Sequence, residues 1–343
     1  MRVVVVGGGI AGLELVRNIK DLDIEIFLIN PSDRMECKAL LPEFISYKVS
    51  EGDMTVDIRN YCDRVCVEFI KDVALKIEEN RVLTRKREIE FDIAVLALGA
   101  RWNTLGKSYS LQTIEDAVRI RKKLRNAENV VVIGSGPTGI EVACEISEFY
   151  CSNVKIIESS DRILPMFRKD VSVFVEKMIR KEGIDVLKSC KVMRVGDVIE
   201  TDRSLIEFDV AISCTGLKPN PLDGIRSRNG WITVDSFLMV KDRIFAIGDC
   251  AHVSIDDRVA TKTAVEAERQ AKHVAGNIRR ILRNRGLKKY RILSSTDKPI
   301  SFITLARRRA VLTYHDYFIP RPMNLLYFLK KRMISSFLSR FRK

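Results

Sequence analysis

The sequence predicts an α/β fold with two parallel-sheet domains, one inserted into the other, and a short C-terminal extension. Three observations predict this arrangement. A strand, a Gly-rich turn, a helix and a second strand follow one another twice along the chain. Each of these units is followed by an apolar strand that ends in small residues, and the last 57 residues are strongly basic. Strands that alternate with helices are typical of parallel sheets.

Length and composition indicate a folded chain of about two or three domains. Of its 343 residues, 46% are hydrophobic and 30% are charged, which excludes a disordered chain. No run of about 18 uncharged apolar residues occurs, so no transmembrane helix is expected, and the first residues do not resemble a signal peptide. None of the eight cysteines forms a CxxC pair, so we expect reduced thiols and no metal.

The first repeated unit lies at the start of the chain. Val3–Val6 is a run of β-branched residues and predicts a strand. The turn Gly7–Gly12 follows, then a helical stretch to about Lys20 and a second strand at Ile24–Ile29. A strand, a GxGxxG turn and a helix in this order are typical of a Rossmann dinucleotide-binding domain.

The second unit repeats that order. Val130–Ile133 predicts a strand, Gly134–Gly139 has the GxGxxG form, a helix runs to about Phe149, and Val154–Ile157 predicts the next strand. One such turn alone is weak support, but two in complete strand–turn–helix–strand context are specific. We therefore expect two Rossmann-like domains.

The three glycines of each turn serve separate purposes. The first permits a tight turn out of the strand, the second lets the backbone approach a pyrophosphate, and the third lets the helix pack closely on the strand. The phosphates would then face the free N–H groups at the positive end of the helix.

The residue that ends the second strand of such a unit normally binds the adenosine ribose. In the second unit this is Glu158, whose carboxylate can accept both ribose hydroxyls and would repel a 2′-phosphate, so NADH is favoured over NADPH. Arg162 lies nearby in sequence and can soften that preference. In the first unit the residue is Asn30, an uncharged departure from the common pattern.

Later strands are expected to close the two sheets. Phe91–Gly99 and Asp209–Gly216 are apolar and end in small residues, and each would bring the chain back beside its dinucleotide. Arg243–Ala251 is a third buried strand, which ends in Gly248 and Asp249. The Asp249 carboxylate can accept a hydrogen bond from a ribityl hydroxyl, and the backbone after it can approach a flavin phosphate.

Together these motifs resemble the two-dinucleotide-binding flavoproteins, the pyridine nucleotide–disulfide oxidoreductase superfamily, over about residues 1–283. Gly136–Glu141 is similar to the NADH site of type II NADH dehydrogenases. Thr261–Ala264, Ala267 and Gln270 resemble the stretch after the Gly-Asp pair in that family and in the ferroptosis-suppressor and apoptosis-inducing-factor-like branch. The resemblance implies two cofactors, FAD and NAD(H).

The resemblance also implies which residues hold each cofactor. The FAD site would comprise Gly7, Gly9, Ile10, Ala11, Gly12, Asn30, Lys38, Leu41, Val73, Ala97, Gly99, Gly248, Asp249, Lys262, Thr263 and Ala264. The NAD site would comprise Gly134, Gly136, Pro137, Thr138, Gly139, Glu141, Glu158, Thr215 and Gly216.

Two residues are assigned catalytic roles. Lys262, next to the helix that would start at Thr263, would stabilise negative charge on the reduced flavin. Glu141 would face the nicotinamide. The alternatives are a surface lysine and a first-turn acid that only stabilises the helix dipole.

The resemblance implies a quinone as electron acceptor, with Glu266, Phe302 and Leu305 near its entrance. One departure bears on this prediction. Type II dehydrogenases often carry an Ala-Gln-x-Ala-x-Gln-Gln motif, and the matching stretch Ala264–Gln270 keeps only the final glutamine. The NADH half is therefore intact, and the choice of acceptor stays open.

Cys37 lies near the position where related disulfide reductases and NADH oxidases use a cysteine. Its surroundings, Cys37–Pro42, look more like the loop of quinone reductases, so an inert thiol is favoured over a thiolate at the flavin. His252 follows the Gly-Asp pair, and an ordinary loop histidine is favoured there over a proton relay.

The positive charge is concentrated in the C-terminal extension. The formal net charge is +14, of which residues 287–343 hold +12. A nearly neutral body disfavours nucleic-acid binding, and the extension is expected to meet something anionic. Pro299–Leu305 and Ala310–Phe318 predict two strands, and Asn324–Arg342 predicts an amphipathic helix.

This last helix is predicted to have one broad apolar face. The face would comprise Leu325, Leu326, Leu329, Met333, Ile334, Phe337, Leu338 and Phe341. With its basic residues, the segment 320–343 fits a helix that lies in the plane of a membrane surface. The alternative is a helix that packs on the body or on a second copy, so a homodimer is left open.

We therefore expect an FAD domain at residues 1–105 and 236–285, an inserted NAD(H) domain at 106–235, and the hairpin and helix at 286–343. The expected function is an NADH dehydrogenase that passes hydride from NADH to FAD and two electrons to a quinone. It would be peripheral on the cytoplasmic side of a membrane, or otherwise cytoplasmic. The alternatives are a reductase of a soluble rubredoxin- or ferredoxin-type protein, an NADH oxidase, and an NADH-sensing flavoprotein.

Overall fold

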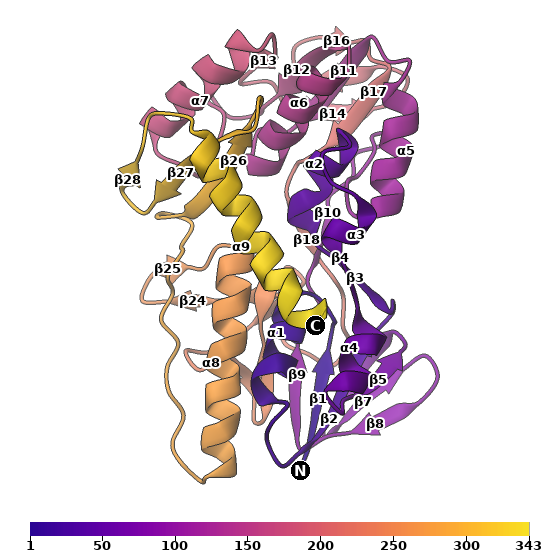
Figure 1. The fold of residues 1–343 in the computed structure, drawn as a ribbon, viewed down its shortest axis with the longest axis vertical. Helices are drawn as coiled ribbons and strands as arrows, with labels where there is room; N and C mark the ends of the chain where they lie inside the picture. The colour runs from indigo at the N-terminus through magenta and orange to yellow at the C-terminus, as the bar shows by residue number, and fades with distance from the viewer. Residues whose placement is uncertain (343) are drawn as a thin grey trace.

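The structure, a computed structural model, describes residues 1–342 and consists of two α/β units stacked along the long axis (Figure 1). The lower unit contains the first strand of the chain, and the upper unit contains the second Gly-rich turn. Each unit is built around a sheet with parallel strands, which confirms the predicted α/β class.

The lower unit has a six-stranded sheet in the order β21-β22-β9-β1-β2-β5. These strands are Met239–Lys241, Ile244–Ala246, Ile93–Leu96, Arg2–Val6, Glu25–Asn30 and Glu68–Lys71. All neighbours are parallel except β21 and β22. The β-branched run in β1 is fully buried, as a central parallel strand requires. Because β1 lies between β2 and β9, the strand order reverses there, and this is where such sheets bind ligands.

The upper unit repeats the arrangement with four parallel strands in the order β13-β12-β11-β17. They are Asp185–Leu187, Asn153–Ile157, Asn129–Ile133 and Val210–Ser213. Here β11 lies between β12 and β17, so the second Gly-rich turn also leaves a strand at a switch point.

Helices of ten residues or more occur in both units and in the C-terminal extension. They are α1 (Ile10–Ile19), α5 (Ile114–Leu124), α6 (Pro137–Phe149), α7 (Lys169–Lys181), α8 (Ala264–Leu282) and α9 (Asn324–Arg342). α1 packs along α8 in the lower unit. The start of α5 is fixed by a capping box, in which Thr113 and Asp116 each accept from the other's backbone N–H.

Short elements complete the fold. The short helices are η1 (Lys38–Leu40), α2 (Leu41–Ile45), α3 (Glu51–Met54), α4 (Ile58–Arg64) and η2 (Gly248–Cys250). The small sheets contain β3 (Arg34–Glu36) and β4 (Thr55–Asp57); β6 (Ala74–Glu78), β7 (Arg81–Thr84) and β8 (Glu88–Glu90); β14 (Val192–Val195), β15 (Ile199–Thr201) and β16 (Leu205–Ile206); β19 (Ser227–Arg228), β20 (Trp231–Thr233) and β23 (Ala251–His252); and β24 (Ser254–Ile255) and β25 (Arg258–Val259).

The two crossings between the units run side by side. β10 (Ala100–Trp102) leads out of the lower unit, and β18 (Leu217–Pro219) leads back from the upper one. They pair antiparallel, with Arg101 opposite Lys218. β21 and β22 then add to the first sheet after the upper unit is complete. The exact domain boundaries stay a prediction.

The C-terminal extension forms a sheet of three strands rather than the two predicted. β26 (Ile300–Leu305) pairs with β27 (Arg309–Tyr314), which pairs with β28 (Tyr317–Phe318). The expected single strand at 310–318 was wrong because the chain reverses at His315, whose φ is +53°. A left-handed residue cannot continue a strand.

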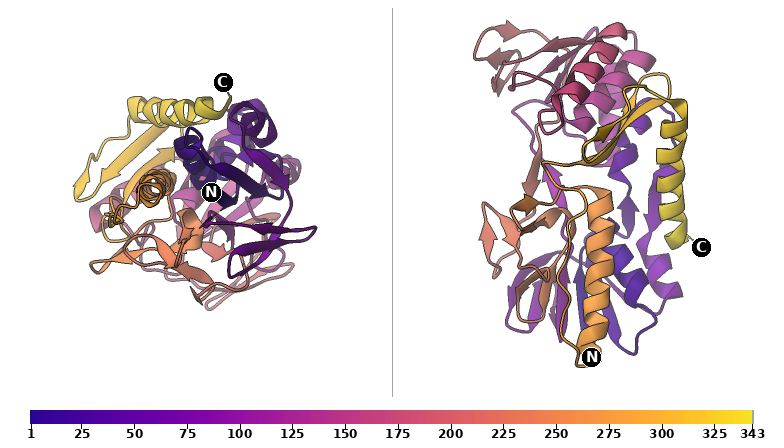
Figure 2. Two further views of the ribbon diagram at one scale, coloured as in Figure 1. Left: turned by 90° about the horizontal axis from the view of Figure 1, so that it is seen from below. Right: turned by 90° about the vertical axis from the view of Figure 1, so that its left-hand side faces the viewer.

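Helix α9 has the predicted bounds and runs along both units (Figure 2). Its apolar residues divide between two faces. Leu326, Tyr327, Phe337, Leu338 and Phe341 are buried against the protein. Leu325, Phe328, Leu329 and Met333 are exposed and form an outer stripe. Part of the predicted apolar face therefore packs on the body, as in the alternative, and part of it faces outward. Among residues 1–342 no helix is both long and apolar enough to cross a membrane.

Phe341 tests whether α9 is part of the folded body. Its side chain is 1% exposed and meets Tyr61 edge-on, with the ring centroids 5.2 Å apart. We expect Phe341→Ala to lower the free energy of unfolding by about 3–5 kcal/mol. Leu325→Ala is the matched control, because that side chain is 72% exposed, and its change should stay within about 0.5 kcal/mol. Urea denaturation measures both values, and equal small effects would mean that α9 is detached in solution.

Candidate active site

Contacts with the neighbouring backbone leave no space for a side chain at the first and third glycines of each turn. Gly7 has φ +113°, and a Cβ there would lie 2.2 Å from the carbonyl oxygen of Ala97 at the end of β9. Gly134 has φ +99°, and its Cβ would lie 2.5 Å from the carbonyl oxygen of Cys214 after β17. A Cβ on Gly139 would lie 2.1 Å from the Gly134 carbonyl oxygen. A Cβ on Gly12 would likewise lie 1.8 Å from the Gly7 carbonyl oxygen.

The second glycine of each turn is different. A Cβ on Gly9 or Gly136 would meet no atom of the chain within 4 Å. Both residues are N-caps, of α1 and α6, and neither helix start has a side-chain cap. The chain therefore leaves open space in front of two helix N-termini, which fits a pyrophosphate at each.

The residues that end the second strands occupy equivalent places. The backbone N–H of Gly8 donates to Asn30 Oδ1 at 2.8 Å. The backbone N–H and hydroxyl of Ser135 donate to Glu158 Oε2. Asn30 and Glu158 thus each stabilise the Gly-rich turn of their own unit, where a nucleotide would bind.

Glu158 is a buried but ionised carboxylate. Burial alone would raise its pKa, but hydrogen bonds from Ser135 and Ser160 outweigh burial and hold the pKa below its usual value. The negative charge favours ribose hydroxyls and disfavours a 2′-phosphate beside it. Arg162 donates to the carbonyl of Pro165 and makes no ion pair with Glu158.

Gly99 and Gly216 occupy equivalent positions in the two units. Both follow the closing strands, both have left-handed φ values, and open space surrounds the position of a Cβ at each. Thr215 precedes Gly216 and is held by Asn103, whose amide donates to its hydroxyl at 3.2 Å. These turns lie at the carboxyl ends of β9 and β17, beside the Gly-rich turns.

Asp249 and two lysines form the charged centre of the lower site. Asp249 lies in η2 after β22 and is half-buried. Burial raises the pKa of its carboxyl, and the nearby charges of Lys262 and Lys38 oppose this rise. Among residues 1–342 no group donates a hydrogen bond to its side chain within the chain, so the carboxylate is free to accept from a ligand hydroxyl.

Lys262 is held rigidly. Its Nζ donates to the carbonyl oxygens of Asp249 at 2.7 Å and Ala251 at 3.1 Å, and it lies 3.8 Å from the centroid of the Trp231 ring. Burial lowers its pKa, although Asp249 opposes this. An ammonium group has three N–H donors, so one remains for a ligand. Lys262 is therefore no surface lysine, and no sequence pattern pointed to its contact with Trp231.

The start of α8 lies next to Lys262. Thr263 is the N-cap and accepts from the backbone N–H of Glu266. Ala264 begins the helix and is exposed. Gln270, the one glutamine that survives from the quinone-reductase motif, accepts from the backbone N–H of Gly248 at 2.7 Å. Its amide therefore fixes the turn that carries Asp249.

The remaining predicted FAD residues lie in α1, in η1 and α2, and in the loop after β5. Ile10 and Ala11 lie in the first turn of α1, and a Cβ on Gly248 would be 3.0 Å from Ala11 Cβ. Lys38, in η1, donates to the carbonyl of Ala100 at 3.2 Å, and Leu41 begins α2 and is buried. Val73 is half-buried in the loop after β5, where its carbonyl accepts from Arg85.

Glu141 lies in the second turn of α6, after Pro137 and Thr138 begin the helix, so the first-turn alternative was wrong. The carboxylate is buried and accepts from Lys330 Nζ of α9 at 2.6 Å and from the backbone N–H of Thr304 at 2.9 Å. Glu141 therefore joins the nucleotide helix to the C-terminal extension.

The three predicted acceptor residues have different surroundings. Both oxygens of Glu266 are used by Tyr290, Leu293 and Ser294, which fixes the segment after α8. Phe302 is half-buried and packs against the cluster that contains Leu326 and Tyr327. Leu305 is buried in the main core.

All eight cysteines are free thiols. Burial raises the pKa of Cys37 to about 11, although the nearby charges of Lys330 and Lys331 lower it. Among residues 1–342 no cluster of His, Cys, Asp and Glu is arranged to hold a metal. His252 has a pKa lowered by burial and by Lys262, so it is neutral at pH 7.

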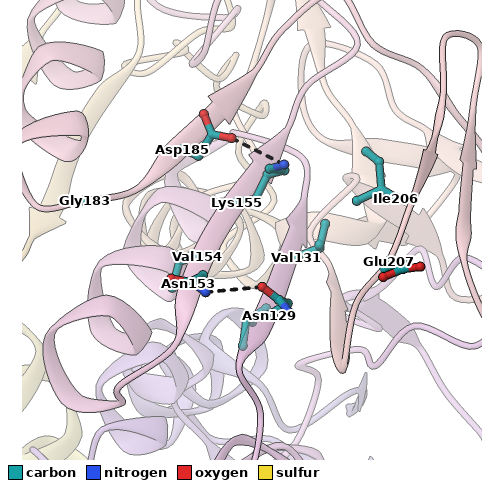
Figure 3. Close-up of a pocket in the computed structure, with 10 residues that line it drawn as sticks. Asn129, Val131, Asn153, Val154, Lys155, Gly183, Asp185, Ile206 and Glu207 are labelled. Carbon is teal, nitrogen blue, oxygen red and sulfur yellow. Dashed lines mark hydrogen bonds and ion pairs between the residues drawn. The ribbon is translucent and has the colours of Figure 1, made fainter.

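A surface hollow of about 340 Å³ lies at the other end of the upper sheet (Figure 3). Asn129 and Asn153, which begin β11 and β12, line it together with Lys155 and Asp185. It contains none of the predicted site residues. Dinucleotides bind at the carboxyl ends of parallel strands, so this hollow is not the nucleotide site.

Comparison with known proteins agrees with the paired geometry. Residues 1–271 match the family described as pyridine nucleotide-disulphide oxidoreductase. The chain belongs to this family. Membership confirms the predicted family of oxidoreductases, whose description names a pyridine nucleotide.

Individual relatives of this oxidoreductase are distant. External alternative NAD(P)H-ubiquinone oxidoreductase B2 of Arabidopsis thaliana is 27% identical, over 74% of this chain and 54% of the plant protein. The chain therefore spans about half the length of that relative. Ferroptosis suppressor protein 1 of Xenopus tropicalis is 24% identical, over 85% of this chain and 83% of the frog protein. NDH2 from Plasmodium falciparum, solved with NADH, has the same fold, with a TM-score of 0.87 at 18% identity over 99% of this chain and 96% of that one.

The oxidoreductase offers a matched pair of glycines in its upper turn. Gly136 has φ −64°, and a methyl group there points into open space, so Gly136→Ala should change the free energy of unfolding by no more than about 1 kcal/mol. We expect it to raise the KM for NADH at least about tenfold, because the methyl group would occupy the pyrophosphate position. Gly134→Ala should instead destabilise the fold by about 2–4 kcal/mol. Thermal unfolding and NADH kinetics measure both, and an unchanged KM in Gly136→Ala would contradict the assignment.

Cys37 gives a second test. With a pKa of about 11, roughly one thiol in a thousand is ionised at pH 8. We expect Cys37→Ser to keep NADH-driven activity within about twofold. Iodoacetamide should modify the exposed Cys66 and Cys151 first, without loss of activity. Inactivation at the rate of Cys37 labelling would show a reactive thiolate instead.

Proposed function

We propose that this chain is an NADH dehydrogenase that passes two electrons from NADH, through FAD, to a quinone at a membrane surface. The observation that carries the proposal is the position of α9. Its inner face reaches the nucleotide helix through Lys330 and Glu141, and its outer stripe of Leu325, Phe328, Leu329 and Met333 is exposed. One helix thus links the proposed reaction site to an exposed apolar surface.

The residues present fit both cofactors. The N–H groups at the starts of α1 and α6 would bind the two pyrophosphates, because Gly9 and Gly136 leave the space open. Glu158 would accept the ribose hydroxyls of NADH, and Asp249 a ribityl hydroxyl of FAD. FAD, when bound, supplies the hydride-accepting ring that a protein side chain cannot provide.

Lys262 would stabilise negative charge and would not transfer a proton. Its ammonium is fixed by the carbonyls of Asp249 and Ala251, and it would favour negative charge on the pyrimidine side of the flavin together with the start of α8. Glu141 would act through its position at the junction of α6, β26 and α9, where it keeps the C-terminal extension closed over the nucleotide side.

The charge distribution of α9 favours lipid over an acidic protein. Lys330, Lys331 and Arg340 are paired with buried or half-buried acids of the body. These cations are therefore not available to attract an acidic redox partner. The outer stripe is apolar, and a helix with an exposed apolar stripe and flanking Arg321 and Arg332 fits a membrane surface.

The acceptor is tested by rapid mixing. NADH should reduce the purified flavoprotein, and a soluble quinone analogue should then reoxidise it far faster than air does. Reoxidation by quinone no faster than by air would refute the quinone and direct attention to protein acceptors. Absence of reduction by NADH would refute the nucleotide site itself.

Membrane binding is tested by sedimentation with vesicles of phosphatidylcholine and phosphatidylglycerol. We expect Leu325→Asp combined with Met333→Asp to weaken binding at least about tenfold, because each change removes buried apolar area and adds a negative charge. Leu205→Asp is the control, since Leu205 is an exposed apolar residue of the upper unit outside α9. Equal binding of all three proteins would contradict the proposal.

A further inference from the structure

Lys262 is a half-buried cation that forms no ion pair with residues 1–342. Its Nζ donates to the carbonyl oxygens of Asp249 at 2.7 Å and of Ala251 at 3.1 Å. Carbonyl oxygens carry only partial charges, so they hold the ammonium group in place without neutralising it. The full positive charge of Lys262 is therefore fixed beside the start of α8, next to the N-cap Thr263.

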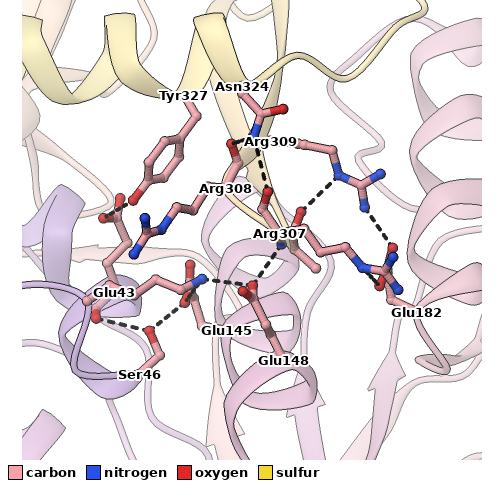
Figure 4. Close-up of polar contacts among 12 residues, drawn as sticks. Glu43, Ser46, Glu145, Glu148, Glu182, Arg307, Arg308, Arg309, Asn324 and Tyr327 are labelled. Carbon is pink, nitrogen blue, oxygen red and sulfur yellow. Dashed lines mark hydrogen bonds and ion pairs between the residues drawn. The ribbon is translucent and has the colours of Figure 1, made fainter.

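Two other poorly exposed cations are each neutralised by an acid of the chain. Arg309 of the hairpin turn lies 2.7 Å from Glu182 (Figure 4), and Lys330 of α9 lies 2.6 Å from Glu141. In both of these contacts the chain itself supplies the opposite charge. Lys262 has no such partner, so its charge remains available to a bound group.

The indole of Trp231 covers one side of this ammonium group. Lys262 Nζ lies 3.8 Å from the centroid of the Trp231 ring, within the range of a cation–π contact. The face of an aromatic ring attracts a cation through its quadrupole, but it adds no charge that could cancel the cation. Trp231 and the two carbonyl oxygens thus restrict the ammonium group, and its charge is retained.

A tight turn determines the position of Trp231. Asn229 and Gly230 join β19 to β20 and have φ values of +51° and +80°. Two successive left-handed residues with the sequence Asn-Gly are typical of a type I′ hairpin, which fixes the register of its strands. Trp231 therefore lies opposite Arg228. A Cβ on Gly230 would lie 2.6 Å from Pro219 Cγ, so the turn is also packed against β18.

The strand next to Trp231 supplies one of the two carbonyl oxygens. β20 pairs in parallel with β23, and Ile232 lies opposite Ala251. The Trp231 ring and the Ala251 carbonyl, which both contact Lys262, therefore come from neighbouring strands of one small sheet. A shift of β20 would move the ring away from the ammonium group.

The titratable groups around Lys262 do not cancel its charge. They comprise two acids, Asp249 and Glu36, two further cations, Lys38 and Arg228, and the neutral His252 and Cys250. With Lys262 included, this set has one positive charge in excess. Negative charge that develops on a group bound beside Lys262 is therefore stabilised.

We propose that Trp231 is a positioning residue that raises the reduction potential of the flavin by confining the Lys262 ammonium group. This inference rests on the flavin site of the proposed function. A hydride carries two electrons and one proton, so its transfer to the flavin adds one negative charge, which collects on the pyrimidine side of the ring. Lys262 stabilises this charge, and Trp231 keeps the ammonium group from turning to water. Both residues thus favour the reduced form.

The midpoint potential of the flavin tests this role. The full-length holoenzyme is reduced slowly together with a reference dye, with neither NADH nor an electron acceptor present. We expect Trp231→Leu to lower the equilibrium constant for two-electron reduction about tenfold, which makes the midpoint potential about 30 mV more negative. Trp231→Phe keeps an aromatic face and should change the constant by less than about threefold. A larger shift in Trp231→Phe than in Trp231→Leu would contradict a role for that face.

A double-mutant cycle separates positioning of Lys262 from direct action on the flavin. Lys262→Met removes the charge and should lower the potential by more than Trp231→Leu does. In the Lys262→Met protein, Trp231→Leu should have no further effect, because no cation remains to be confined. Equal shifts from Trp231→Leu with and without Lys262 would show that the indole acts on the flavin itself, and would overturn the proposal.

Phe27→Leu is the matched control. The Phe27 ring in β2 contacts Arg2, whose guanidinium carbon lies 5.1 Å from the ring centroid, and neither residue is among the predicted cofactor residues. It should leave the midpoint potential unchanged. An unchanged potential in Trp231→Leu, or an equal shift in Phe27→Leu, would refute the positioning role and leave the flavin site standing. A wild-type protein that binds no FAD would instead refute the flavin site, and with it the proposed function.

Discussion

Both proposed cofactor sites depend on the same close approach of two backbone segments. Gly7 passes the carbonyl of Ala97, and Gly134 passes the carbonyl of Cys214, at distances that leave no space for a Cβ. In each unit this approach brings the Gly-rich turn against the carboxyl end of the neighbouring strand. The helix start, the end of the second strand and the turn after the closing strand then converge on one point of the sheet edge. A larger residue at either position would separate these groups, whatever their own chemistry.

The second organising contact is between the units. β10 and β18 form the covalent crossings, but they are only three residues long each. α9 adds ion pairs and apolar packing to both units: Lys330 reaches Glu141 of α6 in the upper unit, Lys331 reaches Glu43 of α2, and Phe341 packs on Tyr61 of α4 in the lower unit. The relative position of flavin and nicotinamide would therefore depend on a segment that contains neither Gly-rich turn.

The sequence predicted those parts that follow from local patterns. The glycine spacing, the β-branched runs and the 3.6-residue period place β1, β11, α6 and α9 within one or two residues of their observed bounds. Long-range partners have no such local signature. The ion pair of Lys330 could not be predicted, because its partner, Glu141, lies 189 residues earlier in the chain. Glu141, Glu145 and Glu148 of α6 are visible as a stripe in the sequence, but only the fold places Lys48 within 2.8 Å of two of them.

The fold also shows where the positive charge of the C-terminal extension is bound. A charge of +12 in residues 287–343 suggests a tail that seeks an external anion. In the fold, three of its cations instead meet buried or nearly buried acids on three different helices: Lys330 with Glu141, Lys331 with Glu43, and Arg340 with Glu14. Removing one partner of a buried ion pair typically costs about 3–5 kcal/mol, because the other charge is left without compensation. Glu43 of α2 and Glu141 of α6 therefore depend on the cations of α9, whereas Glu14 of α1 also pairs with Arg17. An apolar stripe remains outward on α9, so the extension would meet a membrane through this stripe, while three of its cations are already paired inside the protein.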